Sequence, residues 1–417
     1  MDIEKNIGCF ALPAPVRAVL DRLTAAGYEG YLVGGCVRDV LRGVTPHDYD
    51  LTTNALPGDM HRIFAGYRLI DTGIKHGTVT VLADGMPIEV TTYRVDGDYQ
   101  DNRHPTSVRF TANLREDVAR RDFTMNALAY HPALGMRDYF EGCADIAARR
   151  IRAVGEPRRR FEEDALRILR ALRFSAVLDF SIEEQTAAAA RACAPLLAHI
   201  SAERVLEELK KLLCGQNVQA VLLSYADVFA TVLPAWHAAA QADLTAACAL
   251  VAAVPADLVS RFTAFLWPMA GEVASADRLM ADLRFDRRTR ERVCKLLAHR
   301  QDSCTGDTPT LRRFVAGLGG EDALLLLSIH RAEAQLAGQV ERETQLAAAA
   351  DTVKALMQKG VCCTVRDLAV RGEDLSALGC PAGKPMGEAL RALLAAVLDG
   401  RVENEKEQLL SYFQAQL

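Results

Sequence analysis

The 417-residue sequence lacks the features that mark membrane, secreted and zinc-binding proteins. No apolar run approaches the roughly 18 residues that a membrane-spanning helix needs. The opening stretch, MDIEKNIGCFALPAPV, is charged and interrupted by proline, which argues against a secretory signal. The eleven cysteines are scattered and form no CxxC pair, so we expect free thiols and no zinc site. These absences predict a cytoplasmic protein that does not bind a membrane.

The sequence also lacks an excess of basic residues, because its formal net charge is −5. That average argues against a nucleic-acid partner, yet six arginines lie within the twelve residues 149–160. Such a cluster suits a polyphosphate or RNA partner, and it equally suits a solvated basic face. The remaining composition, 50% hydrophobic and 25% charged, is that of a folded protein with about two to four domains.

The pattern of the chain changes near residue 150. Before it, strand signals alternate with amphipathic segments, and we expect helices or strands at 12–26, 30–34, 36–42, 48–52, from 57 onward, 79–82 and 88–92. Asp84-Gly85 is typical of a hairpin turn. The polar stretch 94–109 is longer than an ordinary connection, and such loops tend to be functional. After Glu156 the strand signal ends, which predicts a mixed α/β head followed by an all-helical remainder.

Two acids one residue apart, Asp48 and Asp50, form the first candidate site. In a strand, residues i and i+2 share a face and lie roughly 6.6 Å apart. Carboxylate oxygens suit Mg²⁺, which takes one or two of them together with substrate phosphates. A polar strand edge explains the pair equally well. Glu89, on the polar side of the predicted hairpin, is either a third acid of the site or a surface glutamate.

A glycine turn, Gly34-Gly35, precedes these acids. A strand, a glycine turn and a helix start together cradle phosphates, because glycine lets the backbone approach and the helix N-terminus presents free N–H groups. Arg38 falls in the first helical turn and can donate charge-assisted hydrogen bonds to the same phosphates. The spacing fits neither a Walker A loop nor GxGxxG. The glycines alone fit a packing turn, but the combination favours a nucleoside triphosphate with a metal ion.

The segment RRDFTMNALAY, residues 120–130, is interpreted as arginines followed by a helix with Asp122 as its N-cap. A cap alone would be structural. Arg121, just outside that cap, is a candidate for contact with a triphosphate or a ribose.

The segment FEEDALRILRALRF, residues 161–174, predicts one amphipathic helix. Asp164 and Arg167 lie three residues apart on its polar side, and Arg170 and Arg173 continue that side. The pair is either a surface ion pair of little energetic value or a reader of the nucleotide base. A carboxylate accepts from the exocyclic amine of cytosine or adenine, whereas the carbonyl of uracil or guanine would leave it facing another acceptor. Such a pair selects C and A together.

In order and spacing, the three segments LVGGCVRD…HDYDLTT, RRDFTMNALAY and EEDALRILRALRF resemble the signature motifs of class II tRNA nucleotidyltransferases, the CCA-adding enzymes. ISAERVLEELKKLL, from Ile200, resembles the next motif, and the segment from Arg371 resembles the C-terminal tail of the family. The resemblance implies a polymerase-beta-like nucleotidyltransferase head, with a mixed sheet and helices, followed by helical neck, body and tail. The corresponding ranges are 1–150, 151–215, 216–305 and 306–417, and the fold class is α+β.

The resemblance also implies roles for residues and partners. It assigns Mg²⁺ to Asp48 and Asp50, and base recognition to Asp164 and Arg167, supported by Arg170 and Arg173. It assigns the sugar and triphosphate to Gly35, Arg38 and Arg121. The expected substrates are CTP, ATP and tRNA lacking its 3′ CCA, with no DNA and no membrane. The body and the tail are expected to bind the tRNA through its sugar-phosphate backbone and the shape of its helix, and not through its base sequence.

Several alternatives remain open at this point. A bacterial poly(A) polymerase shares the three motifs, although IKHGTVTVL after Gly73 is more similar to the CCA-adding branch. An enzyme that adds only CC or only A is the second alternative, and the full length of the stretch 94–109 argues against the CC-adding form. A non-enzymatic RNA-binding protein is the third, and Asp48 and Asp50 argue against it. A fused HD-type phosphohydrolase is not expected, because the one His-Asp pair lies inside the acidic motif.

Overall fold

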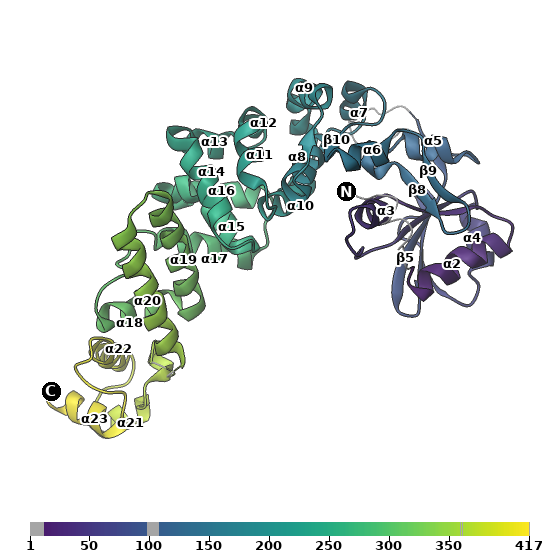
Figure 1. Cartoon of the computed structure of the whole chain (residues 1–417). Coiled ribbons are helices and arrows are strands. Elements are labelled where there is room, and N and C mark those ends of the chain that lie inside the picture. Colours follow the sequence, from purple (N-terminus) through teal and green to yellow (C-terminus); the bar gives the residue numbers. More distant parts are fainter. Residues whose placement is uncertain (1–11, 98–107, 359, 361, 417) are drawn as a thin grey trace. The chain divides into compact units, whose positions relative to one another are not determined.

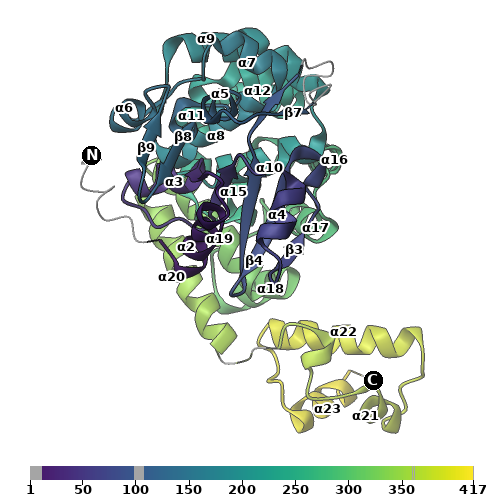
Figure 2. The ribbon, with the colours of Figure 1, turned by 90° about the vertical axis from the view of Figure 1, so that its right-hand side faces the viewer.

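Residues 12–97, 108–358, 360 and 362–416 are described in the computed structural model of the chain. The chain forms two units, Met1–Pro234 and Ala235–Leu417, whose elements can be followed in Figures 1 and 2. The boundary falls inside the range 216–305 predicted as the body, and the finer four-part division stays a prediction. No helix in the part of the chain that the structure describes is long and apolar enough to cross a membrane.

The first unit is built on a seven-stranded mixed sheet in the order β3-β4-β5-β2-β1-β8-β9. Only β2 and β5 pair in parallel within it. The turn between β4 and β5 has positive φ at Asp84 (49°) and Gly85 (81°), as the predicted hairpin requires. Its strands are β1 (Gly30–Val33), β2 (Asp50–Thr53), β3 (Arg68–Ile70), β4 (Thr78–Ala83), β5 (Met86–Thr92), β8 (Leu128–His131) and β9 (Gly135–Asp138).

Two short strand pairs lie outside this sheet. β6 (Arg94–Asp96) pairs with β7 (Val108–Phe110), at the two ends of the stretch predicted as a long polar connection. Residues 98–107 of that connection lie outside the described residues. β10 (Arg150–Ile151) pairs with β11 (Ser181–Ile182), so the prediction that strands end at Glu156 was wrong by one short strand.

Helices cover both faces of the large sheet. A Cβ on Gly30 would lie 2.9 Å from Leu23, so α2 (Ala14–Ala25) packs tightly against that face of β1. Tyr31 points to the opposite face and shares an apolar cluster with Leu114 and Val118 of α5 (Leu114–Ala119). The face of β1 that carries Tyr31 is therefore the α5 face of the sheet.

The remaining helices of the first unit are short, apart from α8, α9 and α10. They are α3 (Gly35–Leu41), α4 (Pro57–Ile63), α6 (Gly142–Ala147), α7 (Pro157–Glu163), α8 (Leu166–Leu178), α9 (Glu184–Cys193), α10 (Ala202–Leu213), α11 (Val218–Ser224) and α12 (Ala226–Val232), with 3-10 turns η1 (Ile74–His76), η2 (Thr124–Asn126) and η3 (Ala194–His199).

Two helix predictions were wrong in this unit. Asp122 caps no helix, because the following residues form the short turn η2 and then the strand β8, which pairs with β1 and β9. The segment 161–174 is not one helix, because α7 ends at Glu163 and Asp164 has extended backbone (φ −142°) before α8 begins. The predicted apolar face of that segment is nevertheless buried, as Ile168 and Leu172 show.

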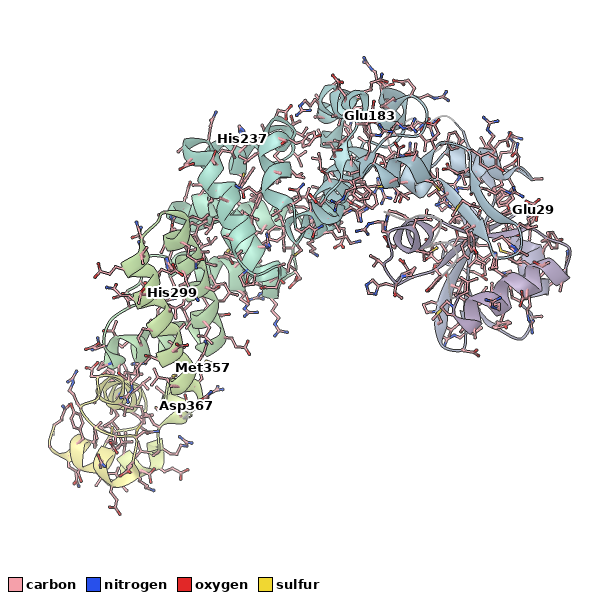
Figure 3. All side chains as sticks on the ribbon, in the orientation of Figure 1. Glu29, Glu183, His237, His299, Met357 and Asp367 are labelled. Atoms are coloured by element: carbon pink, nitrogen blue, oxygen red, sulfur yellow. The ribbon has the colours of Figure 1, made fainter. Side chains whose placement is uncertain are left out.

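The second unit is helical throughout its described residues. In its core, Trp236 stacks on Phe265 with ring centroids 4.2 Å apart. Gly320 lies against Met357, which is labelled in Figure 3, since a Cβ there would meet the Met357 sulfur at 2.5 Å. Its helices are α13 (Pro234–Ala240), α14 (Leu244–Ala253), α15 (Leu258–Phe265), α16 (Val273–Asp282), α17 (Arg287–Ala298), α18 (Thr308–Leu318), α19 (Gly320–Leu336), α20 (Val340–Gln358), α21 (Gly372–Ala377), α22 (Lys384–Leu398) and α23 (Lys406–Gln414), with 3-10 turns η4 (Gln241–Asp243), η5 (Trp267–Glu272) and η6 (Val365–Asp367).

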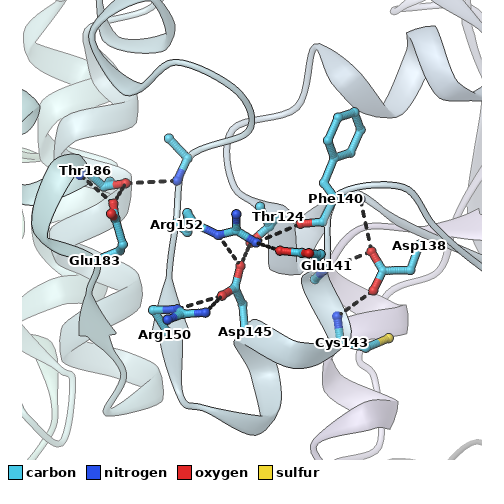
Figure 4. A network of polar contacts seen from close by, with 12 residues as sticks. Thr124, Asp138, Phe140, Glu141, Cys143, Asp145, Arg150, Arg152, Glu183 and Thr186 are labelled. Atoms are coloured by element: carbon cyan, nitrogen blue, oxygen red, sulfur yellow. Dashed lines mark hydrogen bonds and ion pairs between the residues drawn. The ribbon is translucent and has the colours of Figure 1, made fainter.

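A buried carboxylate of α6 joins the turn before β8 to the strand β10. Asp145 of α6 is fully buried and accepts hydrogen bonds from Arg150 Nε (2.7 Å), Arg152 Nε (2.8 Å) and the Thr124 hydroxyl (2.6 Å), as Figure 4 shows. Donors from η2, from β10 and from the residue after β10 therefore meet on one side chain.

We expect an Asp145→Asn variant to lose roughly 1.5 to 3 kcal/mol of unfolding free energy, because it removes the buried anion to which two partly exposed guanidinium groups and the Thr124 hydroxyl donate. Urea unfolding followed by circular dichroism measures this loss. Glu141→Gln is the matched control, because Glu141 also pairs with Arg152 but is 78% exposed, and it should cost less than about 1 kcal/mol. Equal costs for the two variants would contradict the role given to Asp145.

Candidate active site

The predicted acids meet on the α5 face of the sheet. Asp50 begins β2 and is the register partner of Glu89 on β5, so both side chains lie on the same face of adjacent strands. Asp48 lies just outside the strand and is exposed, which differs from its predicted place within a strand. Burial, together with the charges of Glu89 and Asp48, raises the pKa of Asp50 to about 6, while Arg121 acts in the opposite direction.

The chemistry of this donor set fits a hard cation. Three carboxylates that repel one another are stabilised by a cation between them, and oxygen ligands are those that Mg²⁺ prefers. Among the described residues, no three acidic, histidine or cysteine side chains are grouped as a complete metal site. A cation here would therefore depend on oxygens beyond the protein, such as substrate phosphates, which is how Mg²⁺ is commonly held.

The glycine turn brings Arg121 to the same place. Gly34 has φ +75° and ψ −129°, and a Cβ on it would lie 3.1 Å from Arg121 Nη1. The Arg121 guanidinium is 3.9 Å from Asp117 Oδ2, and its buried Nε has no hydrogen-bond partner within the described part of the chain. Burial lowers the pKa of Arg121, while Asp117 and Asp50 raise it. The structure thus joins the glycine turn, Asp50 and Arg121, which lie far apart in the sequence.

We expect Gly34→Ala to weaken nucleotide use by raising the KM for nucleoside triphosphate, because the added methyl displaces Arg121. Gly135→Ala is the matched control, since Gly135 has nearly the same φ (+77°) but open space around it. Both variants should lose about 1 to 3 kcal/mol of stability from backbone strain, measured by thermal unfolding. The prediction fails if the two variants change the KM equally.

Arg38 is buried, and its guanidinium donates hydrogen bonds to two side chains. Its Nε and Nη2 each donate to a carboxylate oxygen of Asp39 at 2.9 Å, and its Nη1 donates to Asn126 Oδ1 at 3.0 Å. Asn126 Nδ2 in turn donates to Asp122 Oδ1 at 3.0 Å. A line of polar contacts therefore runs from Arg38 through Asn126 to Asp122.

The same line continues into α8 and α10. Arg170 Nε donates to Asp122 Oδ2 at 2.8 Å, and Glu208 pairs with Arg173 at 2.7 Å and with Arg170 at 3.8 Å. Burial would raise the pKa of Asp122, but the Arg170 charge holds it well below its ordinary value. Burial lowers the pKa of Arg173 to about 10, although Glu208 opposes this. Arg170 and Arg173 thus lie on the same network as Arg38.

The interpretation of Asp164 and Arg167 as a surface ion pair was wrong, because among the described contacts the two side chains pair with other residues. Both Asp164 carboxylate oxygens accept from Arg204 of α10, at 3.2 and 2.8 Å. Arg167 is 8% exposed, pairs with Glu163 at 2.8 Å and donates to two main-chain carbonyls. The break between α7 and α8 separates the two side chains, so among the described contacts each has another partner. Both nevertheless stay at the junction of the same two helices.

Among the residues around the site that sequence reasoning missed are Asn126, Arg204 and Glu208. Arg204 and Glu208 lie four residues apart on α10 beside the buried Val205 and Leu209. A glutamate on the buried side of so amphipathic a helix is the signal that predicts a buried partner. Asn126 carried no such signal, because its neighbours were interpreted as a helix.

Three family models match successive parts of the chain. A model of the "Poly A polymerase head domain" matches residues 30–152, which contain the sheet and the acids. A model of the "Probable RNA and SrmB- binding site of polymerase A" matches residues 179–239, and one of tRNA nucleotidyltransferase domain 2 matches residues 259–413.

Curated relatives are similar over nearly their full length. The CCA-adding enzyme of Levilactobacillus brevis is 36% identical over 412 residues, which cover 95% of this chain and 96% of that enzyme. The CCA-adding enzyme of Geobacillus thermodenitrificans is 37% identical over 410 residues, covering 94% and 95%. The crystal structure of the Bacillus stearothermophilus CCA-adding enzyme in complex with CTP matches with a TM-score of 0.81 at 31% identity, covering 97% of this chain and 98% of that one.

Proposed function

The chain belongs to the class II CCA-adding enzymes of the poly(A) polymerase and tRNA nucleotidyltransferase family, and from this premise we propose that it adds C, C and A to the 3′ end of tRNA. The substrates are CTP, ATP and tRNA lacking its 3′ CCA, and no template strand takes part. The observation that carries the proposal beyond the family is the convergence of Asp50, Glu89 and Arg121 on one face of the sheet. We place the reaction in the cytoplasm, where these substrates occur.

The head performs the chemistry in this proposal. Nucleotidyltransferases of this family use a divalent metal, and we propose Mg²⁺ on Asp48 and Asp50, with Glu89 as a weaker third ligand. When bound, the ion supplies charge stabilisation to the attacking and leaving oxygens. The RNA 3′-hydroxyl attacks the nucleotide α-phosphate, a new phosphodiester bond forms, and pyrophosphate leaves.

In this proposal the glycine turn and two arginines position the nucleotide. Gly35, Arg38 and Arg121 hold its sugar and triphosphate, with the Arg121 guanidinium on the same face as Asp50. Positioning and charge stabilisation are the main contributions of a protein to phosphoryl transfer. Among the described ion pairs the carboxylate nearest to the Arg121 guanidinium is that of Asp117, at 3.9 Å, which leaves donors of Arg121 for an anionic ligand.

The residues at the α7–α8 junction choose the base. We propose that Asp164 accepts from the exocyclic amine of C or A and that Arg167 donates to the base edge, with Arg170 and Arg173 supporting them. The two-pronged contact of Arg204 fixes the direction of the Asp164 carboxylate, whose oxygens keep further lone pairs for a base. The helical second unit is proposed to hold the tRNA.

Incorporation of labelled CTP and ATP into tRNA lacking its 3′ end tests this function. CTP alone should add two residues, ATP alone none, and both together should complete CCA. Long tails with ATP alone would instead reveal a poly(A) polymerase. Arrest after CC with both nucleotides would reveal a CC-adding enzyme, and no addition at all would favour an RNA-binding protein without activity.

A further inference from the structure

Phe174 of α8 is surrounded by arginines. Its ring is 5% exposed, and the guanidinium carbons of Arg173, Arg38 and Arg170 lie 3.9, 5.1 and 5.5 Å from the ring centroid. Phe123 meets the same ring edge to face, with centroids 5.9 Å apart. Cations from two helices, α3 and α8, therefore gather on one neutral side chain.

These three arginines also repel one another. Each has an acidic partner, since Arg38 pairs with Asp39, Arg170 with Asp122, and Arg173 with Glu208. Glu208 bridges two of them, because it pairs with Arg173 at 2.7 Å and with Arg170 at 3.8 Å. Among the described contacts no carboxylate joins Arg38 to Arg173, whereas the Phe174 ring contacts both guanidinium groups, and the negative face of an aromatic ring attracts a cation lying over it.

We propose that Phe174 is a positioning residue whose ring holds Arg38 and Arg173 in the places from which they act on the nucleotide. The inference rests on the proposed function, in which Arg38 binds the triphosphate and Arg173 supports the base site. A further carboxylate at this position would also hold the arginines, but its charge would repel a triphosphate. The ring attracts the guanidinium groups without adding a negative charge, so the site stays more positive than a further carboxylate would leave it.

The position of Phe174 lets its ring contact arginines from two parts of the proposed site. Arg38 belongs to the helix behind the glycine turn, whereas the ring belongs to the helix that begins next to Asp164. One side chain thus joins the phosphate-binding and base-reading parts of the proposed site. A weaker hold on Arg38 should raise the KM for CTP and for ATP alike, because both nucleotides carry the same triphosphate.

The test replaces Phe174 in the full-length protein with phenylalanine analogues that carry one, two or three ring fluorines. Each fluorine withdraws electron density from the ring face and changes its size only slightly. We expect the KM for both nucleotides to rise stepwise, by about 3- to 10-fold at three fluorines, with kcat changed less than about twofold. A KM that stays flat across the series overturns the proposal.

Phe161 provides the matched control, because it is a fully buried ring of α7. The same fluorines there change packing and hydrophobicity to a similar extent. They should leave the KM unchanged, and a rise equal to that at Phe174 would also overturn the proposal.

An Arg38→Ala variant separates this inference from the function beneath it. If its KM for nucleotide equals that of the parent protein, Arg38 does not bind the triphosphate, and the proposed site itself is wrong. If Arg38→Ala raises the KM while the fluorine series at Phe174 is flat, only the role of the ring is wrong. A rise in both series supports both.

Discussion

Nucleotide addition by an Asp50→Ala variant is expected to fall by at least about a thousandfold, while the fold and tRNA binding remain. The factor corresponds to several kcal/mol of charge stabilisation at the reacting oxygens. The fold should survive, because Asp50 is held among like charges whose repulsion the substitution relieves. Incorporation of labelled nucleotide measures the activity. Thermal unfolding measures the stability of the fold, and a gel shift with tRNA measures tRNA binding.

Asp84→Asn is the control for this experiment. Asp84 is an exposed acid of the same sheet, in the turn between β4 and β5, and asparagine tolerates its positive φ. This variant should keep full activity. Addition at near-normal rates by Asp50→Ala would rule out Asp50 as a ligand of the catalytic metal.

The second large effect concerns selection of the base. An Asp164→Ala variant should lose about 10- to 100-fold of its discrimination against UTP and GTP, because the unpaired acceptor that rejects their carbonyls is gone. Incorporation of each of the four nucleotides, supplied singly to tRNA with the appropriate 3′ end, measures this. Selection as strict as in the parent protein would refute the base-reading role of Asp164.

Loss of the Asp164 carboxylate also releases Arg204, so a structural effect must be separated from a chemical one. Arg204→Ala leaves the carboxylate but removes its fixed direction, and it should weaken selection less than Asp164→Ala does. Glu207→Ala, an exposed acid on the same helix, should change nothing. These variants together distinguish reading by Asp164 from general loosening of the helix junction.

The sequence predicted best what depends on neighbouring residues. The β4–β5 hairpin follows from alternation and the Asp84-Gly85 turn, and the helix after the glycine turn follows from local signals. The strand β8 was predicted as a helix, because a short apolar run does not distinguish a buried strand from a helix. Its strand form comes from its neighbours β1 and β9, which the local pattern does not show.

The residues of the candidate site were predicted, but their tertiary partners were not. The acids and arginines were predicted from residue type and from motif resemblance, and that resemblance correctly predicted the family. The partners of Asp164 and Arg167 were not predicted, because the helix break at Asp164 accompanies a contact with Arg204, forty positions away. Spacing rules for a continuous helix place Asp164 and Arg167 side by side, and they fail once a tertiary contact opens the helix between them.

The parallel pairing of β2 with β5 has a consequence for how the protein folds. Two parallel strands cannot be joined by a tight turn, so α4, β3 and β4 all lie between Asp50 and its partner Glu89. Closure of this connection costs chain entropy before the pairing returns any stability, which slows the step. The acids therefore come together late, and a folding intermediate with the β3–β4–β5 meander already formed still has no site for metal or nucleotide. Catalytic competence and completion of the central sheet are expected to appear in the same kinetic phase.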